Sequence, residues 1–199
     1  MDEHQKFEQA WWGDCLNTYG EETKQRAYAP RMGLDLIVDQ RTGQWPWIDL
    51  GGRTVVDLGG GPVSLLLKAI NRGAGCTIVD PCPYPEWTVA RYGYADIRVE
   101  PIPAEVFERD DEFDEAWIYN CLQHVEDPAK IVENARRAAG IVRIFEWIET
   151  PPTLGHPHTL TADRLDTWLG EEAADGGCRV EYVNEHGAVG LAYFGMVAT

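Results

Sequence analysis

The segment VVDLGGGPVSLLLK, residues 55–68, constrains the fold of this chain more than any other segment. Its first four residues are apolar except for Asp57, a pattern typical of a buried strand. Three consecutive glycines follow, and the apolar run at 63–72 predicts a helix. A strand, a glycine turn and a helix form a surface where a ligand can approach the backbone closely, because glycine has no Cβ.

From residue 54 onward, predicted strands and helices alternate along the chain. This alternation predicts an α/β fold with a mainly parallel sheet and right-handed crossovers. The strands are expected at 54–58, 77–80, 97–100, 115–120 and 141–147, and the helices at 63–72, 86–92, 104–108 and 128–139.

The C-terminal part breaks this alternation. A helix is expected at 160–172, and two strands at 179–185 and 189–197 are separated only by the short sequence EHGA. So short a link favours an antiparallel hairpin. We therefore expect a seven-stranded, mostly parallel sheet with helices on both faces, whose last strand runs antiparallel to its neighbours.

The first fifty residues differ in composition from the rest. They look helical and amphipathic and are rich in large aromatic side chains, among them Trp11, Trp12 and Tyr28. We expect residues 1–50 to form a helical N-terminal lid or extension, and residues 51–199 to form the main ligand-binding domain. The aromatic side chains would cover the ligand, pack on the sheet as core, or line the contact of a homodimer if the chain is not a monomer.

Charge and cysteine content narrow the partners and the compartment. The formal net charge is −16, and a surface this acidic repels phosphate backbones, so nucleic acid and anionic membranes are poor partners. No segment approaches the roughly 20 apolar residues of a membrane helix, and the first residues lack the apolar core of a signal peptide. The five cysteines form no CxxC pair. We therefore expect no disulfide framework, no metal site and a cytoplasmic location.

Two ligand classes use a strand, a glycine turn and a helix, and the residues at this turn discriminate between them. A pyrophosphate needs free backbone N–H groups at the start of the helix, but Pro62 has none. Ser64 stands where the dinucleotide pattern places its last glycine. Asp57 would repel phosphates, whereas it would attract a ligand that carries an ammonium and a sulfonium. A plain structural turn is the remaining alternative.

The pattern Asp57-x-Gly59-x-Gly61 after an apolar strand resembles the first motif of the class I S-adenosylmethionine-dependent methyltransferases, which have a Rossmann-like fold. Val63 stands where that family often has a further glycine. Asp80 ends the second predicted strand, 23 residues after Asp57. An acidic side chain there accepts hydrogen bonds from ribose hydroxyls by the same chemistry as in dinucleotide folds.

Two later segments extend the resemblance over roughly residues 50–150. Ala104-Glu105 is similar to the family's short turn against the adenine. The sequence FDEAWIYNCLQHVEDP, residues 113–128, resembles the family's fourth strand with the loop above it. The N-terminal stretch at 10–34 resembles small methyltransferase-like proteins of phages and bacteria, and its Tyr19, Tyr28 and Met32 would lie near the sulfonium.

The resemblance implies S-adenosylmethionine as cofactor, bound by residues 51–199. The expected cofactor-binding residues are Tyr28, Asp57, Gly59, Gly60, Gly61, Asp80, Pro81, Ala104, Glu105, Asn120, Cys121 and Leu122.

Histidines are the candidate catalytic residues. Methyl transfer to a hydroxyl or a protonated amine requires removal of a proton, which histidine performs near neutral pH. His156 and His158 flank Pro157 after the fifth strand, and extended residues two apart point the same way. They are expected to form a base and its orienting partner, or to be polar residues of a proline-rich loop. His124, in the predicted cofactor loop, is a third candidate with a structural role as its alternative.

These residues predict an S-adenosylmethionine-dependent methyltransferase that acts on an O or N atom of a small-molecule acceptor. One alternative is an NAD-dependent oxidoreductase or a nucleotide-sugar enzyme on a similar sheet. Another is a cofactor-binding interaction protein that does not catalyse a reaction. The acceptor and the choice between O- and N-methylation are not predicted.

Overall fold

The computed structural model describes residues 3–18, 20–37, 47–170, 178–183 and 189–199, with side chains from 178 to 189 left out. A seven-stranded sheet organises the chain in the order β6-β5-β3-β7-β8-β10-β9. β6, β5, β3, β7 and β8 are parallel, whereas β10 is antiparallel to both β8 and β9. The strands are β3 (Val55–Leu58), β5 (Thr77–Val79), β6 (Arg98–Glu100), β7 (Phe113–Tyr119), β8 (Ala139–Ile148), β9 (Cys178–Val183) and β10 (Val189–Ala198).

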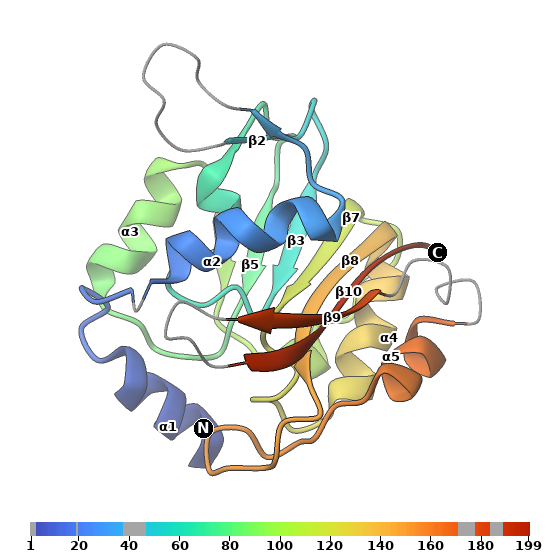
Figure 1. Cartoon of the computed structure of the whole chain (residues 1–199). Coiled ribbons are helices and arrows are strands. Elements are labelled where there is room, and N and C mark those ends of the chain that lie inside the picture. The colour runs from blue at the N-terminus through green and yellow to red at the C-terminus, as the bar shows by residue number, and fades with distance from the viewer. Residues whose placement is uncertain (1–2, 19, 38–46, 171–177, 184–188) are drawn as a thin grey trace.

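Helices cover both faces of this sheet, so the expected architecture is confirmed (Figure 1). α4 (Pro128–Ala138) and α5 (Ala162–Leu169) pack on one face in the larger hydrophobic core. The second core lies on the other face, beneath α2 (Glu21–Tyr28), the 3-10 turns η1 (Ala29–Met32) and η2 (Leu65–Lys68), and α3 (Glu86–Tyr94).

β3 lies between β5 and β7, and its side chains enter both cores. Val56 and Leu58 belong to the first core and Val55 to the second. A strand buried on both faces reads as a continuous apolar run, which is why this strand is recognisable from sequence. The carboxyl end of β3, where Asp57 and the glycines lie, therefore sits in the middle of the sheet edge.

The helix expected at 63–72 is wrong in extent. Only the single turn η2 forms, and the chain is extended again at Ala69, where β4 (Ala69–Ile70) begins. β4 pairs with β2 (Trp47–Asp49), and β2 pairs with β1 (Leu36–Ile37) in a separate three-stranded sheet. The first fifty residues are thus not helical throughout. Short apolar runs suit helix and strand equally, and pairing with a distant strand decides between them.

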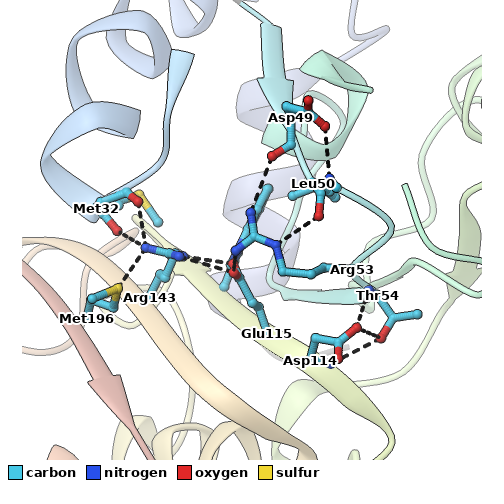
Figure 2. Close-up of polar contacts among 12 residues, drawn as sticks. Met32, Asp49, Leu50, Arg53, Thr54, Asp114, Glu115, Arg143 and Met196 are labelled. Atoms are coloured by element: carbon cyan, nitrogen blue, oxygen red, sulfur yellow. Dashed lines mark hydrogen bonds and ion pairs between the residues drawn. The ribbon is translucent and has the colours of Figure 1, made fainter. Parts of the chain in front are cut away.

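A buried ion network ties the N-terminal segment to the sheet. Arg143 of β8 donates from Nε and Nη2 to Glu115 of β7, at 2.8 and 3.1 Å, and from Nη1 to the carbonyl oxygens of Met32 and Gly33, at 2.9 and 2.8 Å (Figure 2). Arg53 contacts the same Glu115 carboxylate from the other side. The carboxylate of Glu115 is fully buried, so this network fixes the end of η1 against two central strands.

α1 (Glu3–Trp12) lies at the opposite end of the sheet from β2 (Figure 1). The expected turn EHGA, residues 185–188, with its His186, and Tyr19 lie outside the described residues. Among the residues that the structure describes, no helix has the length and apolar character needed to cross a membrane.

Candidate functional site

A pocket of about 950 Å³, counted to its open mouth, lies at the carboxyl ends of β3, β5 and β7. Ten of the twelve residues expected to bind the cofactor line it: Asp57, Gly59, Gly60, Gly61, Asp80, Pro81, Ala104, Glu105, Asn120 and Cys121. The ends of parallel strands are where α/β sheets bind ligands. This pocket is therefore the candidate site.

The glycine turn lets two strands meet closely in the pocket floor. Gly59 has a φ of +76°, and a Cβ built on it would lie 2.5 Å from Cβ of Cys121. A Cβ on Gly60 would lie 2.9 Å from Oδ2 of Asp57. The first position needs glycine for both conformation and space, and the second needs it for space.

Gly59 and Gly61 provide a matched test of this packing. Gly61 also has a positive φ of +61°, but a Cβ there would meet only the Tyr84 hydroxyl, at 3.9 Å. We expect Gly61→Ala to lower the free energy of unfolding by about 1–2 kcal/mol, the cost of the left-handed conformation. Gly59→Ala should cost about 1–3 kcal/mol more, because Cys121 must also move. Urea denaturation measures both; equal losses would mean that the contact with Cys121 is unimportant.

Asp57 is a buried carboxylate with one oxygen free of protein partners. Its side chain is 1% exposed. Oδ2 accepts a hydrogen bond from Oγ of Ser64, whereas Oδ1 has no partner among the described residues. Burial raises the pKa of Asp57 to about 7, against the Ser64 hydrogen bond and with help from the negative charge of Asp80. Such a group gains most from a cationic ligand.

Asp80 follows β5, and its carboxylate contacts both the glycine turn after β3 and the loop after β5. Its Oδ2 accepts the N–H of Gly61 and its Oδ1 accepts the N–H of Cys82, both at 2.9 Å. Burial raises its pKa, although these two backbone hydrogen bonds act in the opposite direction. The side chain of Tyr84 also forms a hydrogen bond with this carboxylate, and because a carboxylate has about four acceptor sites, capacity for a ligand hydroxyl remains.

Asn120 and Cys121 follow β7 and form a pocket wall whose backbone is held from behind. Asn120 has a φ of +51°. Oε1 of Glu146, on β8, accepts the N–H groups of Cys121 and Leu122, both at 2.8 Å. Leu122, which was expected to bind the cofactor, is fully buried in the first core and does not line the pocket, whereas Cys121 does.

Part of the pocket lining is apolar, and we name this group of residues around Ala104 the apolar slot. Ala104 lies in the turn η3 (Ala104–Val106), where its carbonyl accepts a hydrogen bond of 2.9 Å from Nδ2 of Asn134. Oε1 of Glu105 accepts the N–H of Glu126 at 3.0 Å. The slot is completed by Val79, Pro81, Val125 and Ile131. A flat apolar ring with polar edges would fit here.

The first two helices supply further lining residues. Gln5, Glu8 and Trp12 of α1 and Glu21 of α2 line the pocket, and of these only Trp12 was among the residues that the sequence suggested. They come from a segment that ends 38 residues before Gly59, and no spacing rule relates them to the glycine turn. The aromatic content of residues 1–50 was the only available signal.

Tyr28 lies elsewhere than expected. It is fully buried in the second core, stacked on Phe145 at a centroid distance of 4.2 Å, and it does not line the pocket. Tyr119, whose ring centroid is 6.1 Å from that of Tyr28, lines the pocket instead.

The three candidate histidines gather on one side of the pocket, but only His124 lines it. Nδ1 of His124 pairs with Oε2 of Glu8 at 3.2 Å, and its ring lies 4.5 Å from that of His156. Nε2 of His158 contacts the carbonyl oxygen of Val125 at 2.8 Å. His156 and His158 therefore contact different partners, and neither reaches the pocket. The backbones of Thr153 and His156 exchange two hydrogen bonds, which close a tight turn just before this pair of histidines.

Comparisons with solved structures identify the fold. The chain is similar to the Burkholderia thailandensis 1,6-didemethyltoxoflavin-N1-methyltransferase, solved with 1,6-didemethyltoxoflavin and S-adenosylhomocysteine, at 16% identity over 99% of this chain and 88% of that one, with a TM-score of 0.64. A SAM-dependent methyltransferase from Aquifex aeolicus matches at 16% identity over 100% of both chains, with a TM-score of 0.57. The cyclase SpnF matches at 17% identity over 80% of this chain and 58% of that one, with a TM-score of 0.53.

No protein-family model matches the chain, and no curated protein matches it significantly. At identities this low, the likeness establishes the fold and leaves the reaction open. The resemblance read from residues 50–150 is confirmed at that level.

Proposed function

We propose that this chain, which has the fold of the class I S-adenosylmethionine-dependent methyltransferases, is itself such an enzyme and methylates an O or N atom of a small molecule. The observation that supports this most is the Asp57 carboxylate, buried at the glycine turn with Oδ1 directed to no protein partner among the described residues. A buried carboxylate in a pocket calls for a cation, and the ammonium of S-adenosylmethionine supplies one.

The rest of the pocket fits the other parts of the same cofactor. Asp80 offers two carboxylate oxygens to the ribose hydroxyls, and the apolar slot beside Ala104 and Ile131 accepts the adenine. Asn120 and Cys121 border the methionine end. These groups are brought together from three strand ends that are remote in sequence.

The lining charges favour an uncharged or cationic small acceptor. Five carboxylates line the pocket, from Glu8, Glu21, Asp57, Asp80 and Glu105, and no lysine or arginine does so among the described residues. An anionic acceptor would meet repulsion without a compensating cation. A nucleic acid is disfavoured by the same charges and by the net charge of −16.

The bound cofactor would supply an electrophilic methyl group on its sulfonium. The chain's own contribution is alignment and exclusion of water, because in-line displacement depends on orientation. Glu146 holds the wall beside Asn120 through the two backbone N–H groups, and α1 covers the mouth with Gln5, Glu8 and Trp12.

We assign no base role to the histidines. His156 and His158 lie outside the pocket, and His124 is paired with Glu8. Although burial disfavours its charge, Glu8 and Glu146 raise the pKa of His124 above its ordinary value. The ion pair with Glu8 thus favours the protonated form of His124, which has no ring nitrogen free to accept a proton.

A dinucleotide is the alternative that the turn disfavours. Pro62 lacks an N–H, and the N–H of Gly61 already donates to Asp80. A pyrophosphate would also lie beside two carboxylates, those of Asp57 and Asp80.

Binding of S-adenosylhomocysteine tests the proposal. Calorimetry should show binding to the wild type, and Asp80→Ala should weaken it about 30-fold or more, because a charge-assisted hydrogen bond to each ribose hydroxyl is lost. Asp110→Ala, which removes an exposed carboxylate paired with Arg137, is the control and should bind like the wild type. NADH should not bind. A folded wild-type protein that does not bind S-adenosylhomocysteine would contradict the proposal.

Turnover needs a separate experiment. Labelled S-adenosylmethionine, incubated with the protein and a panel of small amines, phenols and heteroaromatic compounds, should give a labelled product. Cofactor binding without any transfer to this panel or to a cell extract would favour the interaction protein over the enzyme.

A further inference from the structure

α1 packs on the body of the protein without entering either hydrophobic core. None of its residues, Glu3 to Trp12, is buried, and neither hydrophobic core contains a residue of α1. Trp11 is 51% exposed and Phe7 is 40% exposed. Isolated helices of this length are marginal in water. A short helix outside both hydrophobic cores opens at a lower free energy than the body of the protein does.

The contacts that hold α1 lie on both sides of the pocket. On one side, Nδ1 of His4 contacts the carbonyl oxygen of Leu154 at 2.7 Å, and the Phe7 ring packs on Gly155. On the other side, Sγ of Cys82 contacts the carbonyl oxygen of Gln5 at 3.9 Å. α1 therefore bridges the loop after β8 and the loop after β5, across the pocket mouth.

An ion pair lies between these two sides. Oε2 of Glu8 is 3.2 Å from Nδ1 of His124, and Oε1 of Glu8 accepts the indole N–H of Trp12 at 2.9 Å. Glu8 and His124 are 21% and 19% exposed, and both line the pocket. Asp80, Pro81 and Val125 line the same end, which is the end that fits adenosine.

The groups around His124 favour its charged form. Burial acts against the charge, but Glu8 of α1 and Glu146 of β8 face His124 and together raise its pKa, while burial raises the pKa of Glu146 itself to about 7. Burial and the charge of His124 lower the pKa of His156, so His156 is the neutral neighbour. His124 in turn lowers the pKa of Glu8, although burial opposes this. The carboxylate of Asp80 and the phenol of Tyr84 are further titratable groups near Glu8.

We infer that Glu8 and His124 retain the cofactor: their ion pair holds α1 over the adenosine end of the pocket, and α1 opens faster when His124 loses its proton. This rests on the proposed function, since it takes S-adenosylmethionine as the ligand beneath α1. Exchange of cofactor and product through this gate is then slow in acid and fast in alkali.

Dissociation of S-adenosylhomocysteine, followed by stopped-flow tryptophan fluorescence between pH 6 and 9, tests the gate. The wild-type rate should rise about five- to tenfold across this range. Glu8→Gln and His124→Gln should release the ligand at the fast rate at every pH. Glu3→Gln, an exposed change on the same helix, is the matched control and should follow the wild-type profile. A flat wild-type profile, or a Glu8→Gln profile like that of the wild type, would overturn the inference.

The gate can also be measured without a ligand, so its failure is distinct from failure of the proposed function. Amide hydrogen exchange of residues 3–12, corrected for the intrinsic pH dependence, should report opening. Protection should fall with rising pH in the wild type and stay low in Glu8→Gln. An NMR titration should place the pKa of His124 lower in Glu8→Gln than in the wild type, and an unchanged value would contradict the ion pair.

Discussion

Replacing Glu115 with alanine should lower the free energy of unfolding by about 3–5 kcal/mol, the usual cost of removing one partner from a buried ion network. Its carboxylate is fully buried and receives Arg143, which is only 6% exposed, and the indole of Trp117. Alanine would leave the Arg143 guanidinium in the second core with backbone carbonyls and a thioether but no counter-charge.

The size of this loss can be separated from a general effect of removing acidic residues. Glu112→Ala removes an exposed carboxylate that pairs with Arg109, and exposed pairs contribute about 0–1 kcal/mol. Guanidinium denaturation at pH 7 measures both variants. Losses of similar size for Glu112→Ala and Glu115→Ala would mean that the network contributes no more than a surface pair.

The same network predicts a loss of stability in acid. Although burial opposes it, hydrogen bonds from Arg143 and Trp117 lower the pKa of Glu115 below its ordinary value of 4.5. The folded state therefore binds this proton less readily than the unfolded state does. Its stabilising contribution is complete above the ordinary value and is lost as the pH falls through the lowered one.

Asp57→Asn, unlike Glu115→Ala, should make the protein more stable, but it should weaken cofactor binding. The folded pKa of Asp57 is raised to about 7 from 3.8. The folded state thus holds this proton more tightly than the unfolded state, and stability falls as the pH rises from about 4 to 7. Asparagine removes this cost, which is on the order of 2–4 kcal/mol at pH 8. Loss of the carboxylate should weaken S-adenosylhomocysteine binding about 30-fold or more.

Thermal melts at pH 5 and pH 8, with calorimetric titrations at pH 8, check both parts of this prediction. The stability gain should be full at pH 8 and reduced to less than half at pH 5. Asp114→Asn is the control of opposite sign, because hydrogen bonds from Thr54 lower the pKa of Asp114, so that variant should gain nothing. If Asp57→Asn changed neither stability nor binding, the buried charge of Asp57 would neither destabilise the fold nor contribute to cofactor binding.

The strands of the parallel part of the sheet could be predicted because they are marked locally. β3 and β7 are buried on both faces and read as apolar runs, and glycine and proline mark the turns between them. The single turn η2 and the strand β4 could not be predicted, because LLLKAI suits a helix as well. Its backbone is extended at Ala69 only because β2, about twenty residues earlier, pairs with it.

The candidate site divides in the same way. Asp57, Asp80 and Asn120 lie at the carboxyl ends of predicted strands, and parallel strands bring these ends together, so their neighbourhood was predictable. Glu8 lines the pocket only because α1 packs over it, and no local sequence pattern predicts where α1 packs. The assignment of Tyr28 to the pocket was wrong because an amphipathic aromatic run does not tell which rings enter the core.

The position of β10 between β8 and β9 affects how the chain folds as it is synthesised. One edge of β8 pairs with β7, which is made earlier, so this pairing needs no residue beyond 148. The other edge of β8, residues 141–148, pairs with residues 191–198 of β10, which are made later. During translation of the intervening forty or so residues, β8 exposes an open strand edge beside the apolar ring of Phe145. Completion of the sheet is then the docking of a preformed hairpin, and a ribosome that pauses within residues 150–190 would leave an aggregation-prone intermediate.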